Sequence, residues 1–181
     1  PALFLFTLGL MFLKQRKWIH FLILFFIACF NKETIILLTM IFAIHFYNDN
    51  EIKKKFFYQF IAIQLAIFSL IKILLLILFM NNPGGFVEFH LIDRNYLLFN
   101  GYSLVTFVVL LIIVLSIFSR WNEKPKFLKD SLWIGVPLLI LTLLFGFFDE
   151  LRDYYEVLSI IILLISFNIA KILDVELVQK V

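Results

Sequence analysis

The tetrapeptide Asn31-Lys32-Glu33-Thr34 lies between two apolar runs, residues 18–30 and 35–47. Each run would form a helix about 20 Å long, at about 1.5 Å per residue. This is shorter than the roughly 30 Å hydrocarbon core of a bilayer. The two runs can form one over-long helix with the charged tetrapeptide buried in its middle. They can also form a hairpin of two short helices with the tetrapeptide at its tip.

The basic residues on both sides of these runs favour the hairpin. Residues 14–17 contain three Lys and Arg residues, and residues 53–55 are all lysines. Loops rich in Lys and Arg prefer the cytoplasmic side of a membrane. If both clusters lie on that side, the segment between them must enter the membrane and return. We therefore expect the hairpin, with residues 31–34 on the outer side or at a shallow depth beneath it.

The composition excludes a soluble globular domain. Hydrophobic residues make up 63% of the chain and the mean hydropathy is +1.02, whereas globular domains average about 45–50% apolar residues. Residues 1–13 lack the charged start and cleavage site of a signal peptide. We expect residues 1–181 to form one membrane-embedded domain, the C-terminal part of a longer chain. The net charge of +3 suits anionic lipid headgroups, and neither nucleic-acid nor nucleotide binding is indicated.

The rest of the chain predicts further membrane crossings. Apolar runs occupy residues 56–80, 103–118, 132–148 and 157–170, and the last is again short, at about 21 Å as a helix. Pro137 is expected to kink the third run, because proline has no N–H to donate to the carbonyl one turn back. Residues 81–102 open with a turn signal and continue with apolar residues at near-helical spacing, which predicts a short amphipathic helix on the outer interface. The expected fold is an all-α, polytopic transmembrane bundle with short paired helices and this outer interfacial helix.

The distribution of basic residues supports this topology. Of the 16 Lys and Arg residues, only four fall outside the loops and tail assigned to the cytoplasmic side: Lys32, Lys72, Arg94 and Arg152. The three tryptophans lie beside the basic loops, at the level where amphipathic rings settle in a bilayer. We therefore expect an integral membrane protein with its Lys- and Arg-rich loops in the cytoplasm.

The segments assigned to the outer side carry charges of both signs and hold the candidate site residues. The candidate phosphate-binding residues are Lys32, Arg94 and Arg152. Arg offers a planar fork of donors to a phosphate group, and Lys offers a point charge. The candidate catalytic carboxylates are Glu33, Asp149 and Glu150. Such a carboxylate would accept the proton of a substrate hydroxyl, orient the cations or help to hold a divalent ion; no other cofactor is indicated.

Each of these assignments has a plainer alternative. Residues 88–94 form either a solvated helix face or a lid over a site at the membrane surface. The charges around Arg152 form either an ion-paired surface cluster or a phosphate site. On an α-helix, one face would carry four of them: Asp149, Arg152, Asp153 and Glu156. Lys72 either extends to the outer interface or faces a cavity as a functional cation.

Two short motifs resemble a pattern in bacterial multi-pass proteins of the GT-C-like glycosyltransferase superfamily, many of them uncharacterised. They are Cys29-Phe30-Asn31-Lys32-Glu33-Thr34 and Phe145-Gly146-Phe147-Phe148-Asp149-Glu150-Leu151-Arg152. The resemblance implies a bacterial inner-membrane protein that transfers sugar from a polyprenyl-phosphate-linked donor on the outer membrane face. It also implies a catalytic carboxylate in the first outer loop of the full protein, upstream of Pro1. Four residues correspond to motif positions: Lys32, Glu33, Glu150 and Arg152.

Two other functions fit part of the sequence. A transporter or flippase also uses short paired helices and charged residues within the membrane, but the charges here gather toward one face. A non-catalytic membrane subunit would use the outer charges only for solubility and packing. In all three hypotheses the immediate partner of the chain is membrane lipid.

The hairpin topology is testable by labelling. In an Asn31→Cys variant, the new thiol is expected to react with a membrane-impermeant reagent only from the outside, because the hairpin places its tip there. Labelling of intact cells and of inverted vesicles measures this. Reaction from the cytoplasmic side would contradict the hairpin.

Overall fold

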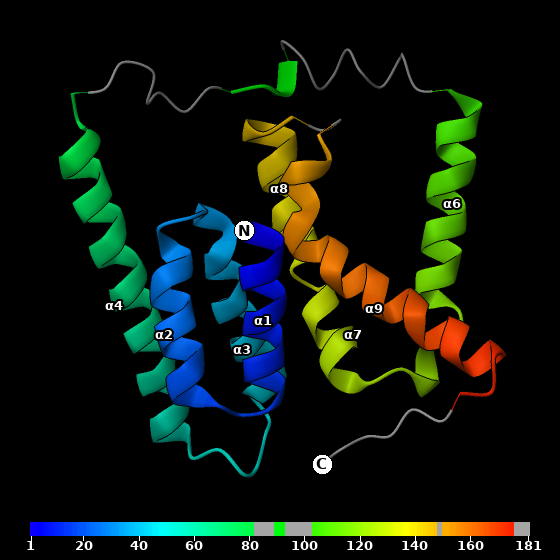
Figure 1. Ribbon diagram of the computed structural model, residues 1–181, viewed down its shortest axis with the longest axis horizontal. Helices are drawn as coiled ribbons and strands as arrows, with labels where there is room; N and C mark the ends of the chain where they lie inside the picture. The colour runs from blue at the N-terminus through cyan, green and yellow to red at the C-terminus, as the bar shows by residue number, and fades with distance from the viewer. Residues whose placement is uncertain (82–88, 93–102, 148–149, 176–181) are drawn as a thin grey trace.

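The computed structural model describes residues 1–81, 89–92, 103–147 and 150–175. The regular structure of these residues is helical throughout, which confirms the all-α fold class. Figure 1 shows the helices side by side, with α4 (Lys54–Phe79) at one edge and α6 (Leu104–Phe118) at the other. The predicted outer interfacial helix falls mostly on residues outside the described ranges.

The charged tetrapeptide ends one helix and begins the next. The first half of the chain contains, in order, α1 (Ala2–Lys14), α2 (Trp18–Cys29), the 3-10 helix η1 (Glu33–Ile36), α3 (Leu37–Phe46) and α4. Lys32 has an extended backbone, with φ −154° and ψ 144°, so no helix runs through it. Helices α1 and α4 both pack against the α2 and α3 pair. The predicted hairpin is confirmed, and it keeps two charges out of the middle of an apolar helix, where they would be costly.

The two basic clusters lie at the same end of the bundle, as the hairpin requires. Arg16, in the α1–α2 turn, has its guanidinium 2.8 Å from the carboxylate of Asp49 in the α3–α4 loop, and it also pairs with Glu51. Figure 1 shows both turns at the lower end, opposite the hairpin tip. In the same view the tip does not reach the upper end of α4. The tetrapeptide therefore lies within the height that α4 spans.

An aromatic cluster around Trp18 forms much of the core of this half. The centroids of four phenylalanine rings lie 5.3 to 5.8 Å from the Trp18 ring: Phe42, Phe46, Phe56 and Phe60. These rings come from α3 and α4, so Trp18 joins α2 to both helices. Trp133, by contrast, is 63% exposed. The tryptophans flanking the basic loops thus differ in role, since one packs inside the bundle and another lies on its surface.

The second half departs from the sequence-based boundaries. It contains α6, η3 (Trp121–Glu123), α7 (Lys126–Leu132), α8 (Gly135–Phe145), η4 (Leu151–Tyr154) and α9 (Tyr155–Ile172). A loop was expected over residues 119–130, but α7 begins at Lys126. The reason is that Phe127 is buried, at 4% exposed, where α7 packs against α3 and α9. Burial of this ring favours a helix at a position where charge alone predicts a loop.

The helix break near Pro137 is confirmed. Helices α7 and α8 are separated at Trp133–Ile134, one turn before the proline. Because Pro137 has no N–H, the Trp133 carbonyl accepts from the N–H of Val136 instead, at 3.2 Å. This break divides the helical stretch Lys126–Phe145 into α7 and α8.

The closing helix is longer than expected. Residues 157–170 predict a short helix, but α9 begins at Tyr155 and contains 18 residues. Together with η4 it forms a helical stretch of 21 residues, Arg152–Ile172. The early start is possible because the charge of Glu156, in the first turn of α9, is neutralised by Lys32. The sequence predicts a second pair of short helices, over residues 132–148 and 157–170. In the structure α8 is short, with 11 residues, and α9 is not.

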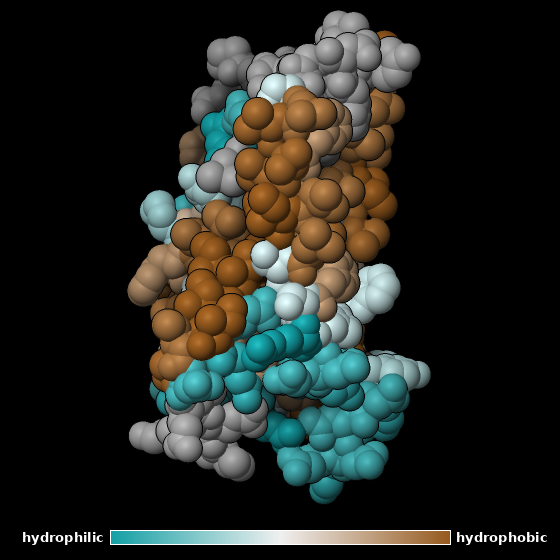
Figure 2. Space-filling model, turned by 90° about the vertical axis from the view of Figure 1, so that its right-hand side faces the viewer, coloured by the Kyte–Doolittle hydropathy of each residue, from teal (hydrophilic) through white to brown (hydrophobic). Residues whose placement is uncertain are grey.

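The helices identify the chain as an integral membrane protein. Three helical stretches in the described residues are long and apolar enough to cross a membrane: Lys54–Phe79, Lys126–Phe145 and Arg152–Ile172. Figure 2 shows a broad apolar surface above a hydrophilic lower end on the face that it presents. A surface of this kind suits contact with lipid chains along most of the height of the bundle.

The two tryptophans provide a matched test of the packing. Trp18→Ala is expected to lower the free energy of unfolding by about 2 kcal/mol, because it removes a half-buried ring that packs against four phenylalanine rings. Trp133→Ala should change it by less than about 0.5 kcal/mol, as is usual at exposed positions. Denaturation of the purified protein in a mild detergent measures both. Equal effects of the two substitutions would contradict the packed role of Trp18.

Candidate functional site

A buried glutamate ties the hairpin tip to the start of α9. The Nζ atom of Lys32 lies 3.1 Å from Oε1 and 3.3 Å from Oε2 of Glu156, and it donates to the backbone carbonyl of Arg152 at 3.0 Å. The hydroxyl of Thr34 also donates to Glu156. Glu156 is only 2% exposed. Two hydrogen bonds of the Lys32 ammonium, to Oε2 of Glu156 and to the Arg152 carbonyl, thus hold the hairpin tip to the start of α9.

Glu33 reaches in a different direction, toward α4. Its carboxylate lies 3.0 Å from the Nζ atom of Lys72. The Glu33 side chain is 81% exposed and that of Lys72 is 25% exposed. Two adjacent residues of the tip, Lys32 and Glu33, thus connect the hairpin to α9 and to α4 respectively. Lys72 is an ion-pair partner at the edge of the site.

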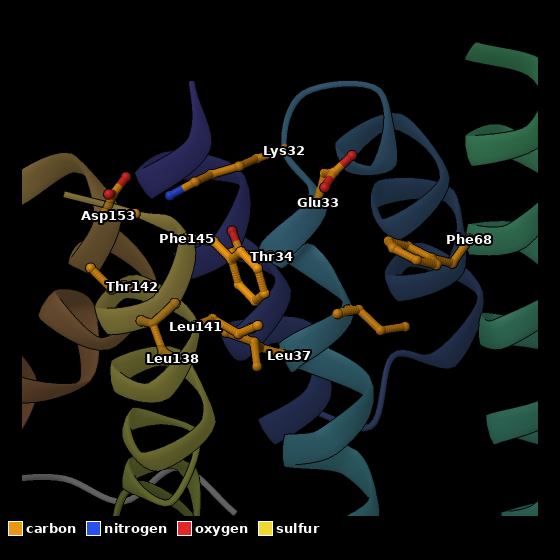
Figure 3. Close-up of a pocket in the computed structure, with 12 residues that line it drawn as sticks. Lys32, Glu33, Thr34, Leu37, Phe68, Leu138, Leu141, Thr142, Phe145 and Asp153 are labelled. Atoms are coloured by element: carbon orange, nitrogen blue, oxygen red, sulfur yellow. The ribbon is translucent and has the colours of Figure 1, made fainter. Parts of the chain in front are cut away.

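A pocket of about 490 Å³ lies between these connections. It is lined from η1, α3, α4, α8 and η4 by Lys32, Glu33, Thr34, Ile36, Leu37, Phe68, Leu138, Leu141, Thr142, Phe145, Gly146 and Asp153. Figure 3 shows Lys32, Glu33 and Asp153 in the upper part of this pocket, with Leu37 and Leu138 below them. The pocket therefore has a charged end and an apolar end.

The end of α8 forms one wall of the pocket, and a glycine shapes it. The Asp153 carboxylate accepts the N–H of Phe147 at 3.0 Å. A Cβ atom at Gly146 would lie 2.7 Å from the Asp153 carboxylate and 3.1 Å from the Cα atom of Thr142. Only a residue without a side chain leaves room for this approach. Gly146 thus allows Asp153 to close the turn that follows α8.

The structure separates the candidate site residues into three groups. Lys32 and Glu33 line the pocket. Glu150 and Arg152 form an ion pair with each other, and neither lines the pocket. Asp149 and Arg94 lie outside the described residues. Within the described ranges no three His, Cys, Asp or Glu side chains gather closely enough to hold a metal ion.

The single charged helix face expected from the sequence does not form. Residues 151–154 are a 3-10 helix, and α9 begins only at Tyr155. Arg152 is directed to Glu150, Asp153 to the Phe147 N–H and Glu156 to Lys32. These charges are separated because each one satisfies a different partner. The α-helical spacing rule applies only where one α-helix continues through all the residues concerned.

The sequence alone places Glu156 and Asp153 in the charged segment without marking them as site residues. For Lys72 it leaves two roles open, an interfacial lysine or a functional cation that faces a cavity. Glu156 could have been singled out because it is a carboxylate in the first turn of an apolar helix. A carboxylate buried at such a position requires a cationic partner. The sequence does not indicate which cation supplies the partner, because Lys32 lies 124 residues away.

Removal of the buried carboxylate tests this arrangement. Glu156→Gln is expected to lower the free energy of unfolding by about 3 kcal/mol, because it leaves the Lys32 ammonium without its counter-charge. Glu150→Gln is the matched control, since its pair with Arg152 is largely exposed and should contribute less than about 1 kcal/mol. Chemical denaturation in detergent measures both. A Glu156→Gln protein as stable as the control would show that the pair does not hold the tip to α9.

Comparison with known proteins assigns the family. A protein-family model described as the EpsG family matches residues 1–176. Searches of curated proteins and of solved structures gave no match. The family match covers nearly the whole chain, including the hairpin, the pocket and the closing helix. This integral membrane protein therefore belongs to the EpsG family.

Proposed function

We propose that the protein is a glycosyltransferase-like membrane protein that uses a polyprenyl-phosphate-linked sugar donor on the outer membrane face. The observation that carries this proposal is the two-ended pocket, with Lys32, Glu33 and Asp153 at one end and aliphatic and aromatic side chains at the other. A lipid-linked sugar has the same division, since a polar sugar phosphate is joined to a long apolar chain. The motif resemblance of the hairpin tip points to the same class of substrate.

The walls of the pocket suit a ligand that arrives through the bilayer. Leu141 and Phe145 of α8 line the pocket, and each is 45% exposed on the surface of the bundle. Phe68 of α4 lines it from another helix. Within a membrane, apolar side chains exposed on such helices face lipid. A lipid carrier can therefore place its chain against these residues while its headgroup lies near Lys32 and Glu33.

The charged end supplies groups suited to glycosyl transfer. In such a transfer the acceptor oxygen bonds to the anomeric carbon, the bond from that carbon to the carrier phosphate breaks, and a base accepts the hydroxyl proton. Glu33 is the best-placed candidate base, because it lines the pocket and is 81% exposed. Lys32 provides positive charge at this end of the pocket. Arg152, the other candidate cation in the described residues, pairs with Glu150 and does not line the pocket.

The proposal is tested by sugar transfer in membranes that contain the protein at its full natural length. Polyprenyl-phosphate-linked sugars are supplied as donors, and transfer to acceptor is followed by radiolabel. Glu33→Gln is expected to reduce the rate at least about 100-fold, which is the usual effect of losing a general base. Its amide keeps the size of the side chain but accepts no proton.

Glu123→Gln is the matched control, because Glu123 is exposed in η3, the short segment between α6 and α7, and does not line the pocket. It should transfer sugar at the normal rate. Normal transfer by Glu33→Gln would reject Glu33 as the base. A natural protein that transfers sugar from none of these donors would reject the proposed function.

A further inference from the structure

We infer that Lys72, in α4, is the cation that contacts the phosphate group of a lipid ligand bound at the charged end of the pocket. This inference rests on the proposed function for the class of ligand and deepens it by giving a specific role to a residue whose role the sequence leaves open. The observations that carry it are the hydrogen-bond partners of the two lysines beside the pocket and the exposure of those partners.

Lys32 is held in place by a buried counter-charge. Two contacts of its ammonium go to Glu156 and one goes to the carbonyl of Arg152. Glu156 is buried, and it is held by Thr34 as well. A phosphate that took Lys32 away would leave a buried carboxylate without its counter-charge, which is costly. Lys32 therefore acts mainly as a fixed part of the pocket wall.

Lys72 is in the opposite situation. Among the described residues, its ammonium donates to the carboxylate of Glu33 at 3.0 Å and lies 5.8 Å from the centroid of the Phe68 ring. One acceptor uses one of the three ammonium donors. The Glu33 side chain is 81% exposed, and an ion pair with so exposed a partner contributes little. A phosphate can therefore bond to the remaining donors or take the place of Glu33 at small cost.

The position of Lys72 also fits this role. It lies four residues after Phe68, so the two side chains share one face of α4. Lys72 is not itself a lining residue, but Phe68 and Glu33, the ion-pair partner of Lys72, both line the pocket. An ionisable residue within a membrane helix is costly unless its charge is used. Lys72 thus lies beside the charged end of the pocket, one helical turn from an apolar residue of its wall.

Equilibrium binding to the purified full-length protein in an uncharged detergent tests the inference. The probes are a polyprenyl monophosphate, the uncharged polyprenol of the same chain length, and inorganic phosphate as competitor. Lys72→Gln is expected to weaken binding of the polyprenyl phosphate about 10-fold or more, as for loss of a hydrogen bond to a charged group. It should leave polyprenol binding unchanged, and Lys72→Arg should retain most of the affinity for phosphate.

Two further variants keep the test independent of folding. Glu33→Gln removes the group that competes for Lys72, so it should strengthen binding of the polyprenyl phosphate severalfold. Lys55→Gln removes an exposed lysine at the other end of the same helix and should change nothing. Competition by inorganic phosphate in the natural protein, lost in Lys72→Gln, would support recognition of the phosphate group from either source. If the protein binds the polyprenyl phosphate more tightly than the polyprenol, and inorganic phosphate does not compete, the site recognises phosphate only when a lipid carries it.

The inference is overturned if Lys72→Gln binds the polyprenyl phosphate as tightly as the natural protein, or if it loses both lipids equally. It is also overturned if Glu33→Gln weakens phosphate binding. These results are distinct from failure of the proposed function. A protein that shows the expected binding but transfers no sugar would retain the Lys72 site and lose the transferase assignment. A protein that transfers sugar, but whose Lys72→Gln variant binds the polyprenyl phosphate normally, would retain the transferase assignment and lose the Lys72 site.

Discussion

The ion pair between Lys32 and Glu156 is the constraint on which the arrangement of this molecule depends. It joins the tip of a short-helix hairpin to the first turn of the last helix, across 124 residues of sequence. Each residue alone would be a costly charge within an apolar environment. Together, and with Thr34 and the Arg152 carbonyl, they form a satisfied polar group inside the bundle. The pair therefore allows charged residues to lie below the ends of the longer helices.

The pocket forms because two adjacent residues, Lys32 and Glu33, pair with different helices. Lys32 connects the tip to α9, and Glu33 connects it to α4. The space between these connections is closed on another side by the end of α8, whose turn is held by Asp153 and made possible by Gly146. The break before Pro137 separates α8 from α7. Local backbone chemistry in one half thus completes a site that begins in the other.

The two ion pairs of the tip differ in burial, and this difference gives them different roles. The Lys32 pair has a buried carboxylate and stabilises the junction of the helices. The Glu33 pair has an exposed carboxylate, so its partners can exchange for a ligand at low cost. A pocket with one fixed wall and one adjustable contact suits a ligand that carries both an apolar chain and an anionic group. The Lys32–Glu156 pair thus holds the helices together, and the Glu33–Lys72 pair leaves charged groups that can bind a ligand.

The sequence by itself determined the membrane environment, the helical class, the hairpin at residues 31–34 and the break near Pro137. These features depend on local properties: the length of apolar runs, the position of basic residues and the missing N–H of proline. It also pointed to Lys32 and Glu33 as candidate residues. The early start of α7 was not predictable, because it depends on burial of Phe127 against helices distant in the sequence.

Only the tertiary structure decided which charges meet. It paired Lys32 with Glu156 and Glu33 with Lys72, and it directed Arg152 to Glu150 and Asp153 to the Phe147 N–H. A spacing rule places side chains on one helix, but partners from different helices are chosen by how the helices pack. The local motif therefore predicts that the tip is charged. The packing of α4, α8 and α9 around that tip decides which charge is fixed and which is available.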